Sequence, residues 1–194
     1  YELASRLDQL KRPVIIYIGG APGTGKSMLA TSLATRLGIN KVISTDSIRE
    51  IMRLAFSNDL LPTLFHSTTE AWKGLPMEFQ SSEQLIAGYC LQANQVSLGV
   101  RAVVERTVEE GENLIVEGAH LVPFLHEIAK KEMVDAYHIP ITLSIMNEKH
   151  HRERFSERGT KNLRKIENFY LERFNGIRSI HEYTLTQCET DEVE

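Results

Sequence analysis

A short segment near the start of the chain carries the residues needed to bind the phosphates of a nucleotide. Residues 20–27 read Gly-Ala-Pro-Gly-Thr-Gly-Lys-Ser, which matches the pattern G-x-x-x-x-G-K-[ST]. In such a loop, backbone N–H groups surround the α- and β-phosphates, Lys26 reaches the β- and γ-phosphates, and the Ser27 hydroxyl ligates Mg²⁺. We expect the nucleotide to be bound by Gly20, Ala21, Pro22, Gly23, Thr24, Gly25, Lys26, Ser27 and Met28.

The residues on either side of this segment distinguish a phosphate-binding loop from a glycine-rich turn in an unrelated fold. A β-branched run at 14–18 precedes the segment, and a helical stretch at 28–37 follows it. A helix that starts at the loop directs the positive end of its dipole at the bound phosphates. The context therefore favours a nucleoside triphosphate site and leaves open what the phosphate is used for.

Three titratable residues follow other predicted strands, at the end where ligands collect in a parallel sheet. Asp46 comes just after the predicted strand 41–44; it could deprotonate or orient an attacking hydroxyl, or hold Mg²⁺ through water. Glu117 ends an apolar strand and could order the water shell of the metal, and His120 could contact an anionic substrate. The alternatives are an N-cap role for Asp46, a loop carboxylate for Glu117 and a structural role for His120.

Arginines occur at helical spacing in two segments. Arg154 and Arg158 lie four residues apart within 148–158, so both guanidiniums could close on one phosphoryl group during transfer. Arg49 and Arg53 form a second pair that could bind acidic groups of the acceptor. The alternatives are a solvated basic helix face and a surface ion pair. Together the pairs suggest that the acceptor is itself an anion.

The composition is that of one soluble globular domain. The chain has 194 residues, of which 42% are hydrophobic and 25% charged, and no apolar run approaches the roughly 20 residues that cross a bilayer. A net charge of −4 argues against a large basic surface for nucleic acid. Cys90 and Cys188 lack metal-ligand spacing, which indicates free thiols and a cytoplasmic location. The oligomeric state is not predicted.

The elements that must position these residues alternate between strands and helices, which indicates an α/β fold with a parallel sheet. The expected strands cover 14–18, 41–44, 113–116 and 139–145. Thr45 or Asp46 is expected to cap the second helix. The expected helices cover 28–37, 48–56, 82–109, a segment that starts at Pro123, 148–157 and 163–185.

Two segments fall outside this alternation. Residues 57–80 are irregular and too long for a simple connection, so we expect them to lie over the site and contact substrate. Residues 1–12 have apolar positions at helical spacing and are expected to form a lead-in helix, the end of a region that precedes the domain 13–194.

Several segments taken together resemble the 2-phosphoglycerate kinase family. The resemblance implies a P-loop NTPase fold like that of nucleoside monophosphate kinases, with a three-layer parallel sheet and a helical lid at about 147–162. It also implies an enzyme that uses ATP and Mg²⁺ to phosphorylate 2-phosphoglycerate, giving 2,3-bisphosphoglycerate. The resemblance rests on residues 18–27, 43–53, 61–64, 70–73, 116–123, 148–158, 170–174 and 176–183.

Residue chemistry and this resemblance together assign roles. The expected catalytic residues are Lys26, Asp46, Arg154 and Arg158; the expected metal ligands are Ser27, Asp46 and Glu117; and the expected acceptor ligands are Asp46, Arg49, Arg53, Glu117 and His120. Two alternatives remain: a kinase of the same fold acting on a nucleoside, a sugar acid, an inositol phosphate or a nucleic-acid 5′-hydroxyl, and an ATP-sensing module without catalysis.

Overall fold

The computed structural model describes residues 7, 9–76, 82–125, 127, 135–161 and 170–190; the side chains at 82, 156–161 and 188–190 are not described. Most of the lead-in helix expected at 1–12, and residues 77–80 of the expected excursion, therefore lie outside the described residues. The same holds for the side chains of Arg158 and Cys188.

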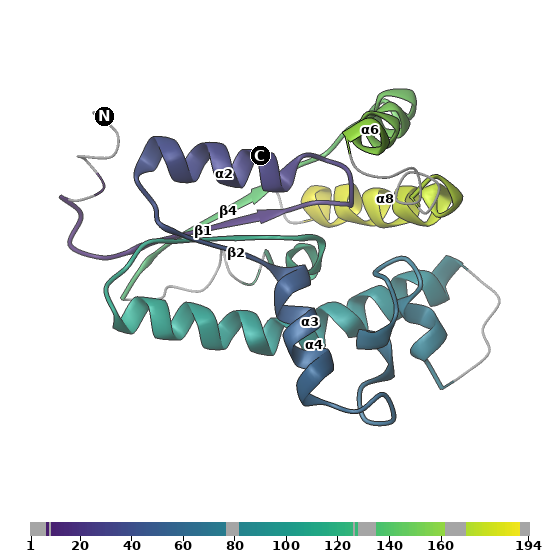
Figure 1. Ribbon diagram of the computed structural model, residues 1–194, viewed down its shortest axis with the longest axis horizontal. Helices are drawn as coiled ribbons and strands as arrows, with labels where there is room; N and C mark the ends of the chain where they lie inside the picture. Colours follow the sequence, from purple (N-terminus) through teal and green to yellow (C-terminus); the bar gives the residue numbers. More distant parts are fainter. Residues whose placement is uncertain are drawn as a thin grey trace.

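A four-stranded parallel sheet forms the middle layer (Figure 1). Its strands lie in the order β2-β3-β1-β4, which confirms the predicted parallel sheet. All of β1 is buried because strands flank it on both edges and helices cover both faces. The strands are β1 (Val14–Gly19), β2 (Lys41–Ser44), β3 (Leu114–Glu117) and β4 (Tyr137–Thr142).

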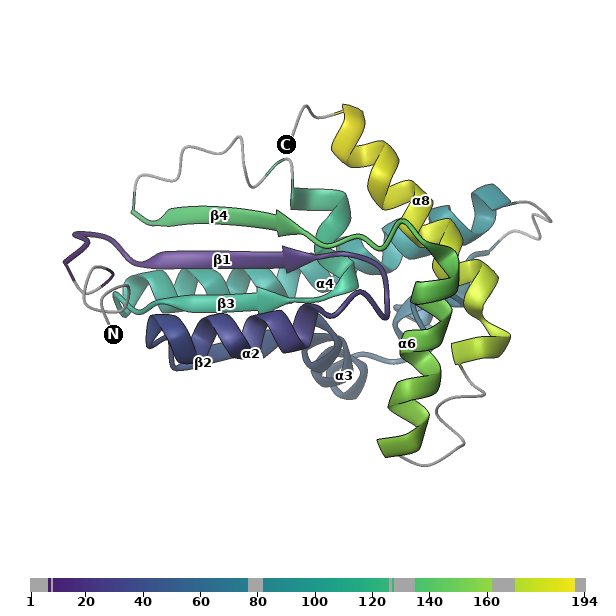
Figure 2. The same cartoon turned by 90° about the horizontal axis from the view of Figure 1, so that it is seen from above.

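Helices cover both faces of the sheet, so the three-layer arrangement is also confirmed. In Figure 1, α2 lies on one face and α4 on the other, next to α3. Figure 2 shows α6 and α8 beyond the carboxyl ends of the strands. The helices are α2 (Lys26–Leu37), α3 (Thr45–Ala55), α4 (Ser82–Glu109), α6 (Glu148–Lys161) and α8 (Phe174–Thr190), with 3₁₀ helices η1 (Pro62–Phe65), η2 (Ala71–Gly74) and η3 (Ala119–Phe124).

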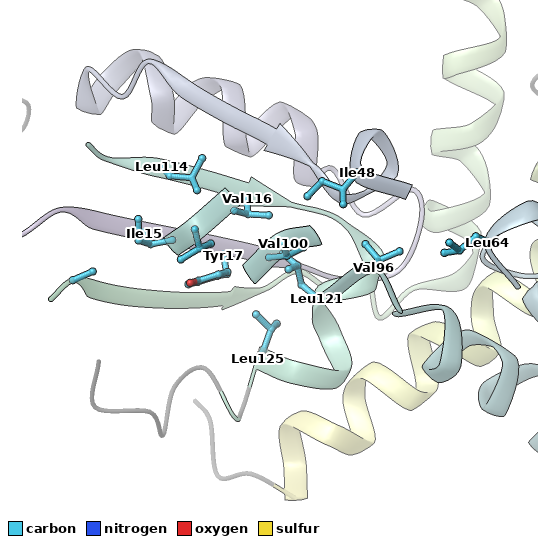
Figure 3. Packing of buried hydrophobic residues seen from close by; sticks show 12 residues of the cluster. Ile15, Tyr17, Ile48, Leu64, Val96, Val100, Leu114, Val116, Leu121 and Leu125 are labelled. Atoms are coloured by element: carbon cyan, nitrogen blue, oxygen red, sulfur yellow. The ribbon is translucent and has the colours of Figure 1, made fainter. Parts of the chain in front are cut away.

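The side chains of β1 alternate between two apolar cores. Ile15 and Tyr17 pack with Val96 and Val100 of α4, the cluster drawn in Figure 3. The alternate residues Val14, Ile16 and Ile18 pack on the other face with Ala30 and Ala34 of α2. Because successive side chains of a strand point to opposite faces, one short apolar run fixes both helix layers.

Several predicted boundaries were wrong. Ser44, not Thr45 or Asp46, caps α3, because its Oγ accepts the Ser47 N–H at 3.1 Å. Pro123 lies within η3, which follows directly on the turn at Gly118, and the described residues 125 and 127 after it are helical, so the predicted helix is present there but Pro123 does not start it. Strand β4 begins and ends earlier than expected, in register with β1. The helix expected at 163–185 is described as helical at 170–172 and from 174 to 190, and its residues 163–169 lie outside the described part of the chain.

The excursion after α3 is more ordered than the sequence indicated. It contains η1 and η2, which pack closely on each other: a Cβ at Gly74 would lie 2.6 Å from the Thr63 backbone nitrogen. Gln92 of α4 donates from Nε2 to the carbonyls of Thr63 at 2.5 Å and His66 at 3.0 Å. These contacts hold the segment just after His66 in a defined position. None of the helices in the described ranges combines the length and apolar character of a membrane-spanning segment.

Candidate active site

The phosphate-binding loop joins β1 to α2, as predicted. Three of its glycines have positive φ: Gly20 at 140°, Gly23 at 88° and Gly25 at 101°. Side chains are strained in this conformation, so the pattern of glycines follows from the backbone path. Gly25 is also the N-cap of α2, and no side chain caps that helix. An N-terminus of this kind suits an anion held by backbone N–H groups.

Lys26 lies against its own loop. Its side chain is buried and donates from Nζ to the Ala21 carbonyl at 2.8 Å, and the Thr24 hydroxyl donates to the same oxygen at 3.0 Å. The lysine is therefore already directed along the inside of the loop.

Ser27 and Glu117 are brought together by the pairing of β1 with β3. The Ser27 hydroxyl donates to Glu117 Oε1 at 2.9 Å, and only 8% of Glu117 is exposed. A hydroxyl and a carboxylate are hard oxygen ligands of the kind that Mg²⁺ prefers. Among the described side chains, no group of three or more His, Cys, Asp and Glu could hold a metal by itself. This donor set suits an ion that bound phosphates also ligate.

Asp46 lies in the first turn of α3 and faces the cleft beside the loop. Its carboxylate is 69% exposed and lies 3.9 Å from Arg49 Nε. Since Ser44 caps α3, the N-cap alternative for Asp46 is excluded. The carboxylate is thus placed for a partner in the cleft rather than for the helix amides.

The cleft that contains these groups has a volume of about 640 Å³. Its walls come from the phosphate-binding loop, α3, the segment after η1, and the chain around the start of α8. Its polar and charged lining side chains are Lys26, Ser27, Asp46, Ser47, Arg49, Glu50, Ser67, Thr68, Thr69, Glu117, Tyr170 and Arg173.

The two predicted arginines of α3 differ in their surroundings. Arg49 lines the cleft, and its Nη1 donates to the His66 carbonyl at 2.6 Å. Both arginines donate to Glu50, Arg49 from Nη2 to Oε1 at 2.8 Å and Arg53 from Nη1 to both carboxylate oxygens. Arg53 also stacks on the Phe65 ring at 5.3 Å and does not line the cleft. The structure brings Arg49 into the cleft and leaves Arg53 outside it.

His120 is buried and does not line the cleft. Gln92 Oε1 lies 3.1 Å from its Nε2, and Thr45 Oγ1 lies 2.8 Å from its Nδ1. Because an amide oxygen can only accept, Nε2 carries the proton and Nδ1 accepts from Thr45. Burial lowers the pKa of His120 to about 4, with the Asp46 carboxylate opposing. His120 is therefore neutral near pH 7 and links α3 to α4, a structural position rather than that of an acceptor ligand.

Helix α6 packs directly on the phosphate-binding loop, where the lid was expected (Figure 2). His151 Nε2 donates to the Pro22 carbonyl at 2.8 Å, and Arg154 Nη1 donates to the Thr24 carbonyl at 3.0 Å. Phe155 is fully buried, and a Cβ at Gly23 would lie 2.3 Å from its Cζ. Arg154 therefore lies beside the loop, while the Arg158 side chain lies outside the described part of the chain.

Sequence reasoning missed several residues of the cleft, namely Ser67, Thr68 and Thr69 of the excursion, and Tyr170 and Arg173 before α8. The length of the segment 57–80 indicated that it contacts substrate, but its irregular pattern gave no sign of which residues do so. Arg173 lies within a segment of the family resemblance but has no sequence neighbour that marks it as a ligand.

A strand, a glycine-rich loop with Lys26 and Ser27, and a helix at the carboxyl edge of a parallel sheet define a P-loop nucleotide-binding protein. A family model described as an AAA domain matches residues 16–175, and the chain belongs to this family.

Similar curated proteins give a narrower classification than the family model does. The chain is 43% identical over 173 residues to a 2-phosphoglycerate kinase of Methanocaldococcus jannaschii, covering 89% of this chain and 54% of that protein. The kinase of Methanopyrus kandleri is 38% identical (100% and 58% covered), and that of Pyrococcus furiosus is 42% identical (94% and 58% covered). The chain thus spans little more than half the length of these relatives. The predicted resemblance is confirmed.

Proposed function

We propose that this chain is the catalytic domain of an ATP-dependent kinase that phosphorylates 2-phosphoglycerate to 2,3-bisphosphoglycerate. The observation that carries the proposal is the position of Asp46 and Arg49 in one cleft with Lys26 and Ser27. The cleft thereby combines a triphosphate loop, a carboxylate for an acceptor hydroxyl, and a cation for an acceptor anion. The names of the curated relatives support 2-phosphoglycerate as the acceptor.

The loop amides and Lys26 would hold the triphosphate, with the lysine exchanging its bond to the Ala21 carbonyl for phosphate oxygens. Mg²⁺ would be held by Ser27 directly and by Glu117 and Asp46 through water, and it would neutralise charge on the phosphate oxygens. The 2.9 Å contact between Ser27 and Glu117 supports this set, because it brings the two oxygens together at the start of α2.

Asp46 would orient the 3-hydroxyl of the acceptor and accept its proton as the phosphoryl group arrives. Arg49 would bind an anionic group of the acceptor, and Arg154 and Arg158 would contact the phosphoryl group in transfer. The bond from Arg154 to the Thr24 carbonyl supports this assignment, because it holds one guanidinium at the loop. We also infer a cytoplasmic location, which the free thiol of Cys90 supports.

The test is ADP release from Mg·ATP with and without 2-phosphoglycerate, compared with glycerate, 3-phosphoglycerate, nucleosides and inositol phosphates. We expect release that depends on 2-phosphoglycerate and that is lost in Lys26→Ala. Turnover with another acceptor alone would overturn the substrate assignment and leave a kinase. Tight ATP binding without turnover of any acceptor would favour a sensor.

A further inference from the structure

The wall of the cleft formed by residues 170–177 carries a second arginine, which has no role in the scheme above. We infer that Arg173 binds an anionic group of the acceptor and that Glu70 is the positioning residue that holds it, an inference that rests on the proposed function. Arg173 and Arg49 line the same cleft although they are far apart in the sequence.

Glu70 holds Arg173 through a defined contact. Arg173 Nε donates to Glu70 Oε2 at 2.9 Å, and the two side chains are 25% and 21% exposed. The same carboxylate accepts from Ser67 Oγ at 2.9 Å and from Lys73 Nζ at 2.5 Å. A carboxylate with three donors is fixed in orientation, so the guanidinium plane that it binds is fixed as well. The hydrogen bond from Arg173 is the main cause that lowers the pKa of Glu70 to about 2, so the pair is charged at neutral pH.

The pair joins two segments whose neighbouring residues line the cleft. Glu70 belongs to the excursion that also supplies Ser67, Thr68 and Thr69, while Arg173 lies at the turn before α8. Arg173 lines the cleft, whereas Glu70 lies behind the lining. The carboxylate thus holds the arginine from outside the cleft, and the lining of the cleft includes both Arg49 and Arg173.

This lining indicates the chemical class of the acceptor. Guanidiniums bind carboxylate and phosphate oxygens in a planar, paired geometry. Arg49 and Arg173 together fit a small acceptor with two anionic groups beside its reacting hydroxyl. An acceptor with a single anionic group, such as glycerate, would satisfy only one of them.

The experiment compares Arg173→Gln, Glu70→Gln and the double variant with a matched control, Arg106→Gln, whose side chain is 69% exposed on α4. For Arg173→Gln we expect the KM for the acceptor to rise about 10- to 100-fold, the loss typical of a charged hydrogen bond, with the KM for ATP changed less than about threefold. Glu70→Gln should show the same pattern more weakly. The double variant should match Arg173→Gln alone, because Glu70 acts through the arginine.

Arg173→Lys serves as a second variant if Arg173→Gln folds poorly, because it keeps the charge but loses the Nε bond. An unchanged KM for the acceptor in a folded Arg173 variant would overturn the inference and leave the proposed function intact. Equal effects on both substrates, or additive effects in the double variant, would show a structural pair and overturn it as well.

If the proposed function is wrong, the wild type will not turn over 2-phosphoglycerate, a result that differs from an unchanged KM in the Arg173 variants. Trp72, the only tryptophan, lies in η2 two residues from Glu70 and can then report binding. With the loop saturated by Mg·ADP, inorganic phosphate should change the fluorescence of the wild type and of Arg106→Gln. A titration that is lost in Arg173→Gln would support an anion site at Arg173, and one that persists would overturn it.

Discussion

Arg49 and Arg53 lie one helical turn apart on α3, yet only Arg49 lines the cleft. We expect Arg49→Ala to raise the KM for the acceptor about 10- to 100-fold, the loss typical of a hydrogen bond to a charged group. Arg53→Ala, the matched control, should change the same KM less than about threefold, because Arg53 does not line the cleft and stacks on Phe65. Steady-state kinetics on both variants decide this, and equal effects would contradict the cleft assignment.

A substitution of Asp46 should affect catalysis without a comparable loss of stability. Asp46→Asn should lower kcat about 10²- to 10⁴-fold, the usual contribution of a general base. Because Ser44 caps α3, the same change should cost less stability than Ser44→Ala, which should cost about 1 kcal/mol. The kcat and the denaturation midpoint of each variant provide the check. A normal kcat in Asp46→Asn would remove the residue from the mechanism.

Because His120 is buried, we expect the free energy of unfolding to decrease at acid pH. Its pKa is about 4 in the folded chain against an ordinary value of 6.5, so between these values the unfolded chain binds more protons. Stability should therefore fall as the pH drops from 6.5 towards 4, by on the order of 2 kcal/mol at pH 5 from this residue.

Chemical denaturation at pH 7 and pH 5 tests this for the wild type and for His120→Gln, in which the amide can still accept from Thr45 and donate to Gln92. The variant should lose less stability on acidification. His150→Gln, an exposed control, should behave like the wild type. The same pH dependence in all three chains would show that His120 does not titrate as described.

Some site residues could be predicted from the sequence, and others could not. The loop 20–27 could be predicted because its pattern specifies both ligands and backbone shape. Nothing in the sequence distinguishes Arg49 from Arg53, since their difference comes from the carbonyls of η1 and the following turn, which lie near one arginine only. For the same reason His120 could not be assigned: its partners, Thr45 and Gln92, come from distant segments.

At the scale of elements, α6 is the part that the mechanism requires as a lid. Arg154→Ala should lower kcat at least about 10²-fold, because a guanidinium that stabilises the phosphoryl group in transfer contributes strongly to the rate of that transfer. Lys149→Ala, on the same helix with a side chain that is 82% exposed, is the control and should keep its activity. Turnover preserved in Arg154→Ala would mean that α6 does not serve as the lid.

The strands and most helices could be predicted because apolar spacing follows secondary structure directly. The excursion could not, because η1 and η2 are fixed by close contacts with α4, such as the approach of Gly88 to the Trp72 backbone, where a Cβ would lie 2.3 Å from the Trp72 nitrogen. Such a contact requires a glycine at one position, but it produces no periodic pattern of apolar residues from which the 3₁₀ helices could be predicted. The start of η3 was likewise set by the turn at Gly118 rather than by Pro123.

At the scale of the molecule, the sheet order places every carboxyl end that carries a site residue at one edge. Because β3 lies between β2 and β1, Glu117 stands between the loop after β1 and the α3 residues after β2. Strand alternation indicated a parallel sheet, but it did not specify the order β2-β3-β1-β4, which depends on how the helices pack. With this order, the loop, Asp46, Glu117 and Arg49 line one cleft, as a phosphoryl transfer enzyme needs.

The reaction proposed for this chain is transfer of the γ-phosphoryl group of ATP to the 3-hydroxyl of 2-phosphoglycerate. Phosphorus NMR of a reaction mixture containing the chain, Mg·ATP and 2-phosphoglycerate is the decisive test. We expect ADP together with a product that has two phosphomonoester signals, on C2 and C3 of one glycerate, and no such product with Lys26→Ala. Loss of ATP without a second phosphomonoester, or an unchanged mixture in which ATP binding is shown, would contradict the proposed transfer.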